Sequence, residues 1–220
     1  MKERSAVLLD LDAIAAGPLA RAPFPYTTAS GVIGREGLDA LDRDFPPIER
    51  PGIFPLSSLR YGPAFAQLVD EIGGSQMQAV IEQKFAVDLS DRPLMITVRG
   101  QCQARDGQIH TDSLDKIVTC LLYLNRPSWD DDGGRLRLLR DGADIESAIA
   151  EVAPTGGTFV AFRRTANSWH GHKPFVGPRR YVMFNWLRSE AALAKNVARH
   201  ALSAMVKHLG RRPQKDAERD

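Results

Sequence analysis

The sequence has few cysteines and no long hydrophobic run. Only Cys102 and Cys120 occur among its 220 residues, so a disulfide framework is excluded and reduced thiols in the cytoplasm are the simpler interpretation. No window of about 18 apolar residues is present, so we expect no membrane span. Asp10 and Asp12 interrupt the apolar stretch near the N-terminus, which argues against a signal peptide.

An excess of charge of one sign is also missing. Lys and Arg number 29 and Asp and Glu number 27, so the formal net charge is only +2 and nothing indicates a nucleic-acid partner. Hydrophobic residues make up 43% and charged residues 25%, which is ordinary for a globular chain and excludes global disorder. We expect one domain over residues 1–220, as a monomer or a homodimer.

Proline, glycine and hydrophobic spacing divide that domain. Residues 1–60 hold seven of the 14 prolines, which predicts an extension of loops and short strands, the best of them at 6–11. Within 61–92, helical spacing predicts helices near 65–72 and over 75–85, the second with Ser75 as N-cap. A further helix is expected over 189–209, followed by a mobile charged tail over 210–220.

The hydrophobic period changes to two from residue 93 onward. Strands are predicted over 94–98, 117–124, 136–139, 158–162 and 181–187. Short strands separated by glycine- and aspartate-rich turns are typical of a β-sandwich, a jelly roll or a barrel.

Two histidine motifs in this β-rich part could bind a metal. His110 and Asp112 are two residues apart, so in a strand their side chains share one face. A histidine from a second strand would complete the 2-His-1-carboxylate set that suits non-haem Fe(II) and leaves coordination positions open. Either His170 or His172 could be that ligand, the other being a hydrogen-bonding partner.

The last predicted strand offers a cationic group. Arg180 shares a face with three apolar residues, so it is expected at the mouth of an apolar barrel, where a guanidinium can clamp a carboxylate. The opposite face carries Arg179. Tyr123, on the strand over 117–124, could donate its hydroxyl to the same carboxylate.

The order and spacing of these residues resemble the prolyl-hydroxylase-like branch of the 2-oxoglutarate- and Fe(II)-dependent dioxygenases, over about residues 93–187. The features that carry the resemblance are His110-Thr111-Asp112, Tyr123-Leu124-Asn125, Gly133-Gly134 before a Leu-Arg-Leu strand, His170 with Pro174, Arg180 and Trp186.

The resemblance implies a fold, a site and a reaction. The fold would be mainly β with flanking helices, a double-stranded β-helix (a cupin-like jelly roll) with its core over 93–188. His110, Asp112 and His170 would bind Fe(II), and Arg180, supported by Tyr123, would bind the distal carboxylate of 2-oxoglutarate. The cosubstrate would be decarboxylated to succinate and CO₂ while a C–H bond of a small-molecule or peptidyl substrate is hydroxylated. Ascorbate is a candidate reductant.

One departure from the family pattern affects the cosubstrate. Many relatives place a tyrosine that contacts the cosubstrate on the strand before the His-x-Asp motif, whereas residues 98–102 read Val-Arg-Gly-Gln-Cys. Some cosubstrate contacts must therefore differ. Asp112 favours hydroxylation over halogenation, because a halogenating relative needs this ligand position vacant for the halide. The alternatives are a non-catalytic metal-binding jelly roll that acts as a sensor or binding protein, and a zinc hydrolase, which lacks an obvious general-base glutamate here.

Overall fold

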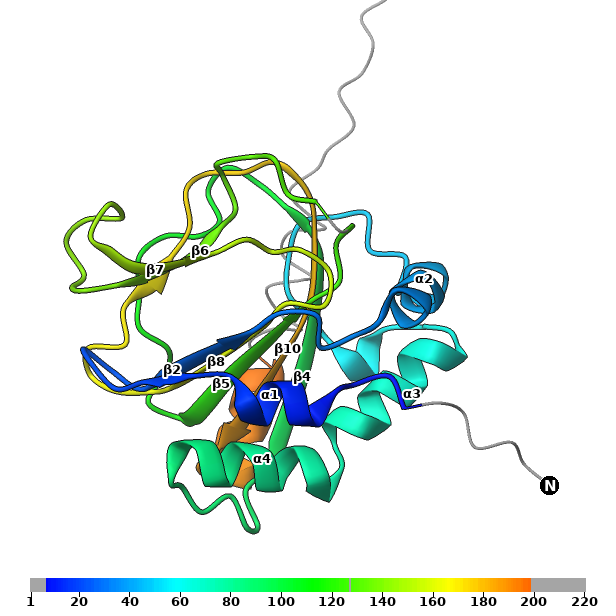
Figure 1. Cartoon of the computed structure of the whole chain (residues 1–220), viewed down its shortest axis with the longest axis horizontal. Coiled ribbons are helices and arrows are strands. Elements are labelled where there is room, and N and C mark those ends of the chain that lie inside the picture. Colours follow the sequence, from blue (N-terminus) through cyan, green and yellow to red (C-terminus); the bar gives the residue numbers. More distant parts are fainter. Residues whose placement is uncertain (1–6, 127, 199–220) are drawn as a thin grey trace, which may run out of the picture.

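Two antiparallel sheets form the centre of the computed structural model, which describes residues 7–126 and 128–198 (Figure 1). The large sheet has seven strands in the order β1-β2-β8-β5-β10-β4-β3, and the small sheet has three in the order β7-β6-β9. The strands of the large sheet are β1 (Leu19–Ala20), β2 (Tyr26–Ala29), β3 (Phe54–Pro55), β4 (Leu94–Cys102), β5 (Lys116–Tyr123), β8 (Phe159–Arg163) and β10 (Gly177–Leu187). The strands of the small sheet are β6 (Leu136–Leu139), β7 (Ala148–Val152) and β9 (His170–Gly171).

Helices cover the face of the large sheet that is turned away from the small sheet (Figure 1). They are α1 (Leu11–Ala16), α2 (Arg35–Asp44), α3 (Pro63–Ile72) and α4 (Ser75–Phe85), with a short 3₁₀ helix over Leu56–Ser58. Helices α3 and α4 each present one apolar stripe at a spacing of three and four residues, which buries Phe65, Leu68 and Ile72 from the first and Met77, Ile81 and Phe85 from the second. The molecule is therefore layered as helices, large sheet and small sheet.

Strand β10 is buried on both faces because it lies between these layers. Val182, Phe184 and Trp186 pack in the cluster shared with the helices. Tyr181 and Met183 pack in the second cluster, between the two sheets. The strand runs antiparallel to β4 on one side and to β5 on the other, so it is central to the large sheet.

The face of Arg180 was assigned wrongly from the sequence. Its apolar companions on β10 pack against the helices and not inside the barrel. Arg180 itself is only partly buried, lies over the ring of Phe45 and pairs with Asp42 of α2. The apolar face of this strand meets the helical layer, while the mixed face that includes Tyr181 borders the cavity between the sheets.

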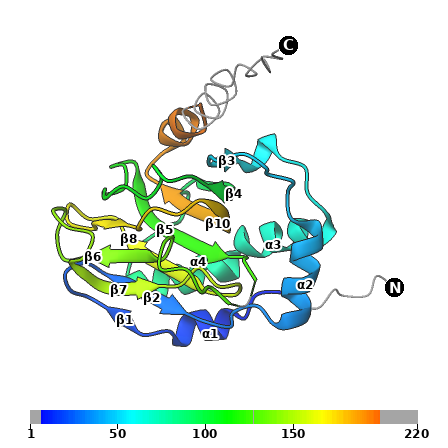
Figure 2. The ribbon, with the colours of Figure 1, turned by 90° about the horizontal axis from the view of Figure 1, so that it is seen from above.

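The N-terminal 60 residues contain short elements, but the strand predicted over 6–11 is not one of them. Leu9 makes an isolated bridge to Ile33, and helix α1 begins at Leu11. Asp10 caps this helix by accepting a hydrogen bond from the backbone N–H of Ala13 at 2.8 Å. Strands β1 and β2 extend one side of the large sheet and β3 forms its other edge (Figure 2).

The predicted helices over 65–72 and 75–85 are present, although Gly74 and not Ser75 is the N-cap of α4. Residues 190–198 are helical, and the remainder of the predicted helix over 189–209 and the tail over 210–220 lie outside the described residues. Within the described chain, no helix combines the length and apolar character needed to cross a bilayer.

Candidate metal centre and adjoining cavity

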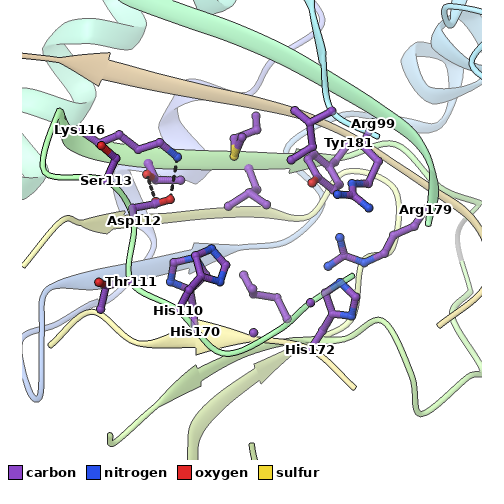
Figure 3. Close-up of a pocket in the computed structure, with 17 residues that line it drawn as sticks. Arg99, His110, Thr111, Asp112, Ser113, Lys116, His170, His172, Arg179 and Tyr181 are labelled. Atoms are coloured by element: carbon purple, nitrogen blue, oxygen red, sulfur yellow. Dashed lines mark hydrogen bonds and ion pairs between the residues drawn. The ribbon is translucent and has the colours of Figure 1, made fainter. Parts of the chain in front are cut away.

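The space between the two sheets holds a cavity of about 530 Å³, a size typical of small-ligand sites (Figure 3). Its lining residues come from β4, β5, β6, β9, β10, the segments that follow β4 and β9, and the residue before β3. They are Ile53, Arg99, Gly107, His110, Thr111, Asp112, Ser113, Lys116, Thr119, Leu121, Leu136, His170, Gly171, His172, Arg179, Tyr181 and Met183.

Backbone pairing brings the two predicted histidine ligands together. The N–H of His110 donates to the carbonyl of His170 at 3.0 Å, and the N–H of His170 donates back at the same distance. A reciprocal pair of this kind places the two side chains on one face, and the ring centroids lie 4.3 Å apart. Asp112 follows two residues after His110, and one ligand atom from each of the three residues lies within 4.8 Å of the others.

Both imidazoles are oriented by backbone carbonyls. Nδ1 of His110 lies 2.8 Å from the carbonyl oxygen of Gln108, and Nδ1 of His170 lies 3.0 Å from that of Ser168. A carbonyl can only accept, so each Nδ1 carries the proton and each Nε2 keeps a free lone pair for a metal. Burial lowers the pKa of His170 to about 4, so this imidazole is neutral at neutral pH.

Two side chains of β5 hold the Asp112 carboxylate. Lys116 Nζ donates to one oxygen at 2.7 Å, and Thr119 Oγ1 donates to the other at 2.5 Å. Burial alone would raise the pKa of Asp112, but the charge of Lys116, the proximity of His170 and these hydrogen bonds hold it well below its usual range. The carboxylate is therefore ionised and fixed in orientation, as a metal ligand must be.

Arg179, and not Arg180, enters the cavity from β10. Arg179 is 2% exposed, and its guanidinium is held by donation from Nε to the carbonyl of Gly134 at 2.7 Å and from Nη2 to the Tyr123 hydroxyl at 3.2 Å. No carboxylate of residues 7–126 or 128–198 forms an ion pair with Arg179, although burial of an unpaired charge is costly.

The Arg179 guanidinium is thus a cation prepared for an anion that enters the cavity. It also lies over the rings of Tyr123 and Tyr181, with its central carbon 5.4 and 5.3 Å from their centroids. Burial raises the pKa of Tyr123, so its hydroxyl stays protonated and can donate a hydrogen bond as well as accept one. Tyr123 therefore supports Arg179, whereas the sequence analysis predicted that Tyr123 supports Arg180.

His172 lines the same cavity but stands apart from the metal-ligand cluster, at the end where Arg179 lies (Figure 3). Its Nδ1 lies 2.8 Å from the carbonyl of Lys173, and its Nε2 lies 3.9 Å from Cys102 Sγ. Burial, followed by the charge of Arg179, lowers its pKa to about 4. The choice between His170 and His172 as the third member of the cluster is therefore resolved in favour of His170.

The comparisons with known proteins agree with this geometry. A family model described as the 2OG-Fe(II) oxygenase superfamily matches residues 100–188. Residues 100–188, less than half of the chain, are thus similar to the 2OG-Fe(II) oxygenase superfamily. The matched segment contains the His-Asp-His cluster, Arg179 and Tyr123, and the match supports the superfamily and the class of 2-oxoglutarate-dependent oxidoreductases predicted from the sequence.

Solved structures confirm the double-stranded β-helix fold of the oxygenase. A prolyl-4-hydroxylase from Pseudomonas putida is 18% identical, with a TM-score of 0.55 over 84% of this chain and 96% of the other. The viral collagen prolyl hydroxylase from Paramecium Bursaria Chlorella virus-1 is 15% identical, with a TM-score of 0.52 over 74% of this chain and 95% of the other. No curated protein sequence matches the chain significantly.

Several cavity residues were not singled out from the sequence. Lys116 and Thr119 follow Asp112 by four and seven residues, and the inward parity of β5 could have indicated Thr119, which shares a face with Tyr123. Arg99 appeared in the sequence only as part of a segment that lacks tyrosine, yet it lines the cavity and faces Tyr181 across the β4–β10 pair.

Proposed function

We propose that this oxygenase hydroxylates an unactivated C–H bond of a small-molecule or peptidyl substrate and releases succinate and CO₂ from 2-oxoglutarate. The observation that supports this most strongly is one cavity with two complementary parts. The His110, Asp112 and His170 cluster lies at one end, and the unpaired guanidinium of Arg179 lies at the other (Figure 3).

The donor set fits Fe(II). Two imidazole nitrogens and one carboxylate oxygen from the three residues would take one face of the metal and leave positions open toward the cavity, as in non-haem iron oxygenases. When bound, Fe(II) activates O₂ for the oxidative decarboxylation of 2-oxoglutarate and the linked hydroxylation of the substrate. Lys116 and Thr119 would keep the Asp112 carboxylate ionised and oriented throughout.

Arg179 would bind the distal carboxylate of 2-oxoglutarate. A buried guanidinium offers parallel donors that match a carboxylate, and the apolar rings of Tyr123 and Tyr181 exclude water around it. The Tyr123 hydroxyl accepts a hydrogen bond from Arg179, so its own proton would be available to donate to the same carboxylate. These residues would direct the keto-acid end of the cosubstrate toward the metal cluster.

The remaining predictions from the sequence concern the domain, the reductant, the oligomeric state and the location of the protein. We propose one domain over residues 1–220, ascorbate as an auxiliary reductant, and a monomeric or homodimeric protein without a nucleic-acid partner. Cys102 and Cys120 are both buried free thiols, which supports the cytoplasmic location predicted from the sequence.

The test of the proposed function is succinate release. Purified protein supplied with Fe(II), 2-oxoglutarate and oxygen should form succinate, at a rate that a pool of peptides and small molecules containing a substrate increases. His110→Ala should abolish the release because it removes a metal ligand, whereas Arg180→Gln should leave it unchanged. Succinate release that persists in His110→Ala, or its complete absence from the parent protein, would contradict the proposal.

A further inference from the structure

A second buried guanidinium, that of Arg99, lines the cavity near Arg179. Arg99 lies on β4 directly opposite Tyr181 of β10 and is 7% exposed. Its central carbon is 5.9 Å from the Tyr181 ring centroid, and that of Arg179 is 5.3 Å from the same centroid. The close-up shows Arg99, Tyr181 and Arg179 grouped at the end of the cavity away from His110 and His170 (Figure 3).

The hydrogen bonds of Arg99 use only part of its donor set. Nη1 donates to Asp106 Oδ2 at 2.5 Å and lies 3.7 Å from Cys102 Sγ. Nε is fully buried and has no acceptor within the described chain. A buried donor without an acceptor is costly, and most buried polar groups in native proteins find a partner. Nε–H and the neighbouring Nη2–H lie along one edge of the guanidinium, where a carboxylate binds with two hydrogen bonds.

Among the described residues at the cavity, the cations outnumber the carboxylates by one. Arg99, Arg179 and Lys116 are cations, and Asp106 and Asp112 are the carboxylates that pair with two of them. A bound Fe(II) adds two positive charges and a bound 2-oxoglutarate removes two. The loaded cavity therefore keeps an excess of one positive charge at low dielectric, which favours a further anion.

We propose that Arg99 binds a carboxylate of the substrate through its Nε edge. The inference rests on the proposed function and specifies its substrate class, namely a small acid or a peptide with an acidic residue. The Tyr181 ring contacts both guanidiniums, so the substrate carboxylate and the distal carboxylate of the cosubstrate would bind at neighbouring arginines. Arg99 thus acts as a specificity determinant, and the metal residues play no part in this recognition.

The first test compares acids with their amides. Fe(II)-loaded protein with saturating 2-oxoglutarate receives a pool of N-acetyl amino acids or the matching pool of N-acetyl amino acid amides, and succinate release is measured. A parallel pair of blocked peptide pools differs only in Asp and Glu against Asn and Gln. We expect an acid pool to stimulate release at least about tenfold more than its amide counterpart, because a charge-assisted pair is lost in the amide.

Stimulation by the N-acetyl acids would identify a small acid as the source of the carboxylate, and stimulation by the acidic peptides would identify a side chain. Equal responses to acids and amides in both pairs, including no response to any pool, would overturn the proposal. Iron-dependent binding of 2-oxoglutarate is measured separately. If that binding is intact, only the substrate inference fails, whereas its absence would remove the proposed function itself.

The second test replaces Arg99. Arg99→Lys keeps a cation beside Asp106, so the fold is preserved, but it removes the Nε edge. We expect the acid concentration for half-maximal stimulation to rise at least about tenfold, while the dissociation constant for 2-oxoglutarate changes less than about twofold. Arg180→Gln, outside the cavity, is the matched control. An unchanged acid requirement in Arg99→Lys would overturn the proposal, as would an equal loss of 2-oxoglutarate affinity.

Discussion

Replacing Arg179 by glutamine should weaken 2-oxoglutarate binding far more than the same change at Arg180, its neighbour on β10. Arg179 is 2% exposed, lines the cavity and has no carboxylate partner in the part of the chain that the structure describes. Arg180 points away from the cavity, where it pairs with Asp42. The two substitutions remove the same group from adjacent positions, so they isolate the effect of the cavity.

The expected magnitude follows from the environment of each arginine. A hydrogen bond to a charged group in a buried site contributes about 1.5–3 kcal/mol, which corresponds to about a 10- to 150-fold change in affinity. A solvent-exposed pair such as Arg180 with Asp42 contributes about 0–1 kcal/mol to stability and nothing to a ligand it does not touch. Glutamine keeps a polar side chain at Arg179, which limits the effect on folding.

The assay is anaerobic calorimetric titration of the Fe(II)-loaded variants with 2-oxoglutarate. The dissociation constant should rise about 10- to 150-fold in Arg179→Gln and stay within about twofold of the parent value in Arg180→Gln. Circular dichroism and thermal melting of both variants verify that they are folded. An equal rise in the two variants, or a rise confined to Arg180→Gln, would refute the assignment of Arg179 and restore the one made from the sequence.

Four further substitutions test other contacts. Asp112→Ala should abolish iron retention, measured by elemental analysis after desalting, since one of three ligands is lost; retained iron would count against the cluster. Thr119→Val removes the hydroxyl that donates to Asp112 and should weaken iron about 10- to 100-fold by competition with a chelator. Tyr123→Phe leaves Arg179 without its hydroxyl contact and should raise the 2-oxoglutarate requirement by less than Arg179→Gln does. Gly107→Ala should lower the melting temperature, because Gly107 has φ +84° and a Cβ there would lie 2.3 Å from a cavity imidazole.

Much of the fold could be predicted because the local spacing of hydrophobic residues indicates which segments form strands and helices. Strands with a period of two, such as β5 and β6, and helices with an apolar stripe, such as α3 and α4, were located to within a few residues. Helix α1 was not predicted because it is only six residues long, and the strand expected over 6–11 overlaps it at Leu11 alone. Strand β9, two residues long, has no periodic signal and is defined by its pairing with β6 and by the bridge between His170 and His110.

The metal cluster was predictable from spacing, but the orientation of the arginines was not. His110, Asp112 and His170 are brought together by backbone pairing between distant segments, and their identities were carried by the motif. Alternation along β10 correctly placed Arg179 and Arg180 on opposite faces of the strand. Alternation alone does not say which face packs on the helices and which borders the cavity. Because the strand is buried on both faces, the apolar face was taken for the barrel interior, while it packs on the helices.

The central claim, that one cavity holds Fe(II) and 2-oxoglutarate together, is tested most directly by anaerobic titration of metal-free protein with Fe(II) in the presence of 2-oxoglutarate. The account predicts that a weak visible charge-transfer band grows to saturation at one iron per chain and is absent from His110→Ala. Iron binding without that band, or an equal band in His110→Ala, would contradict it.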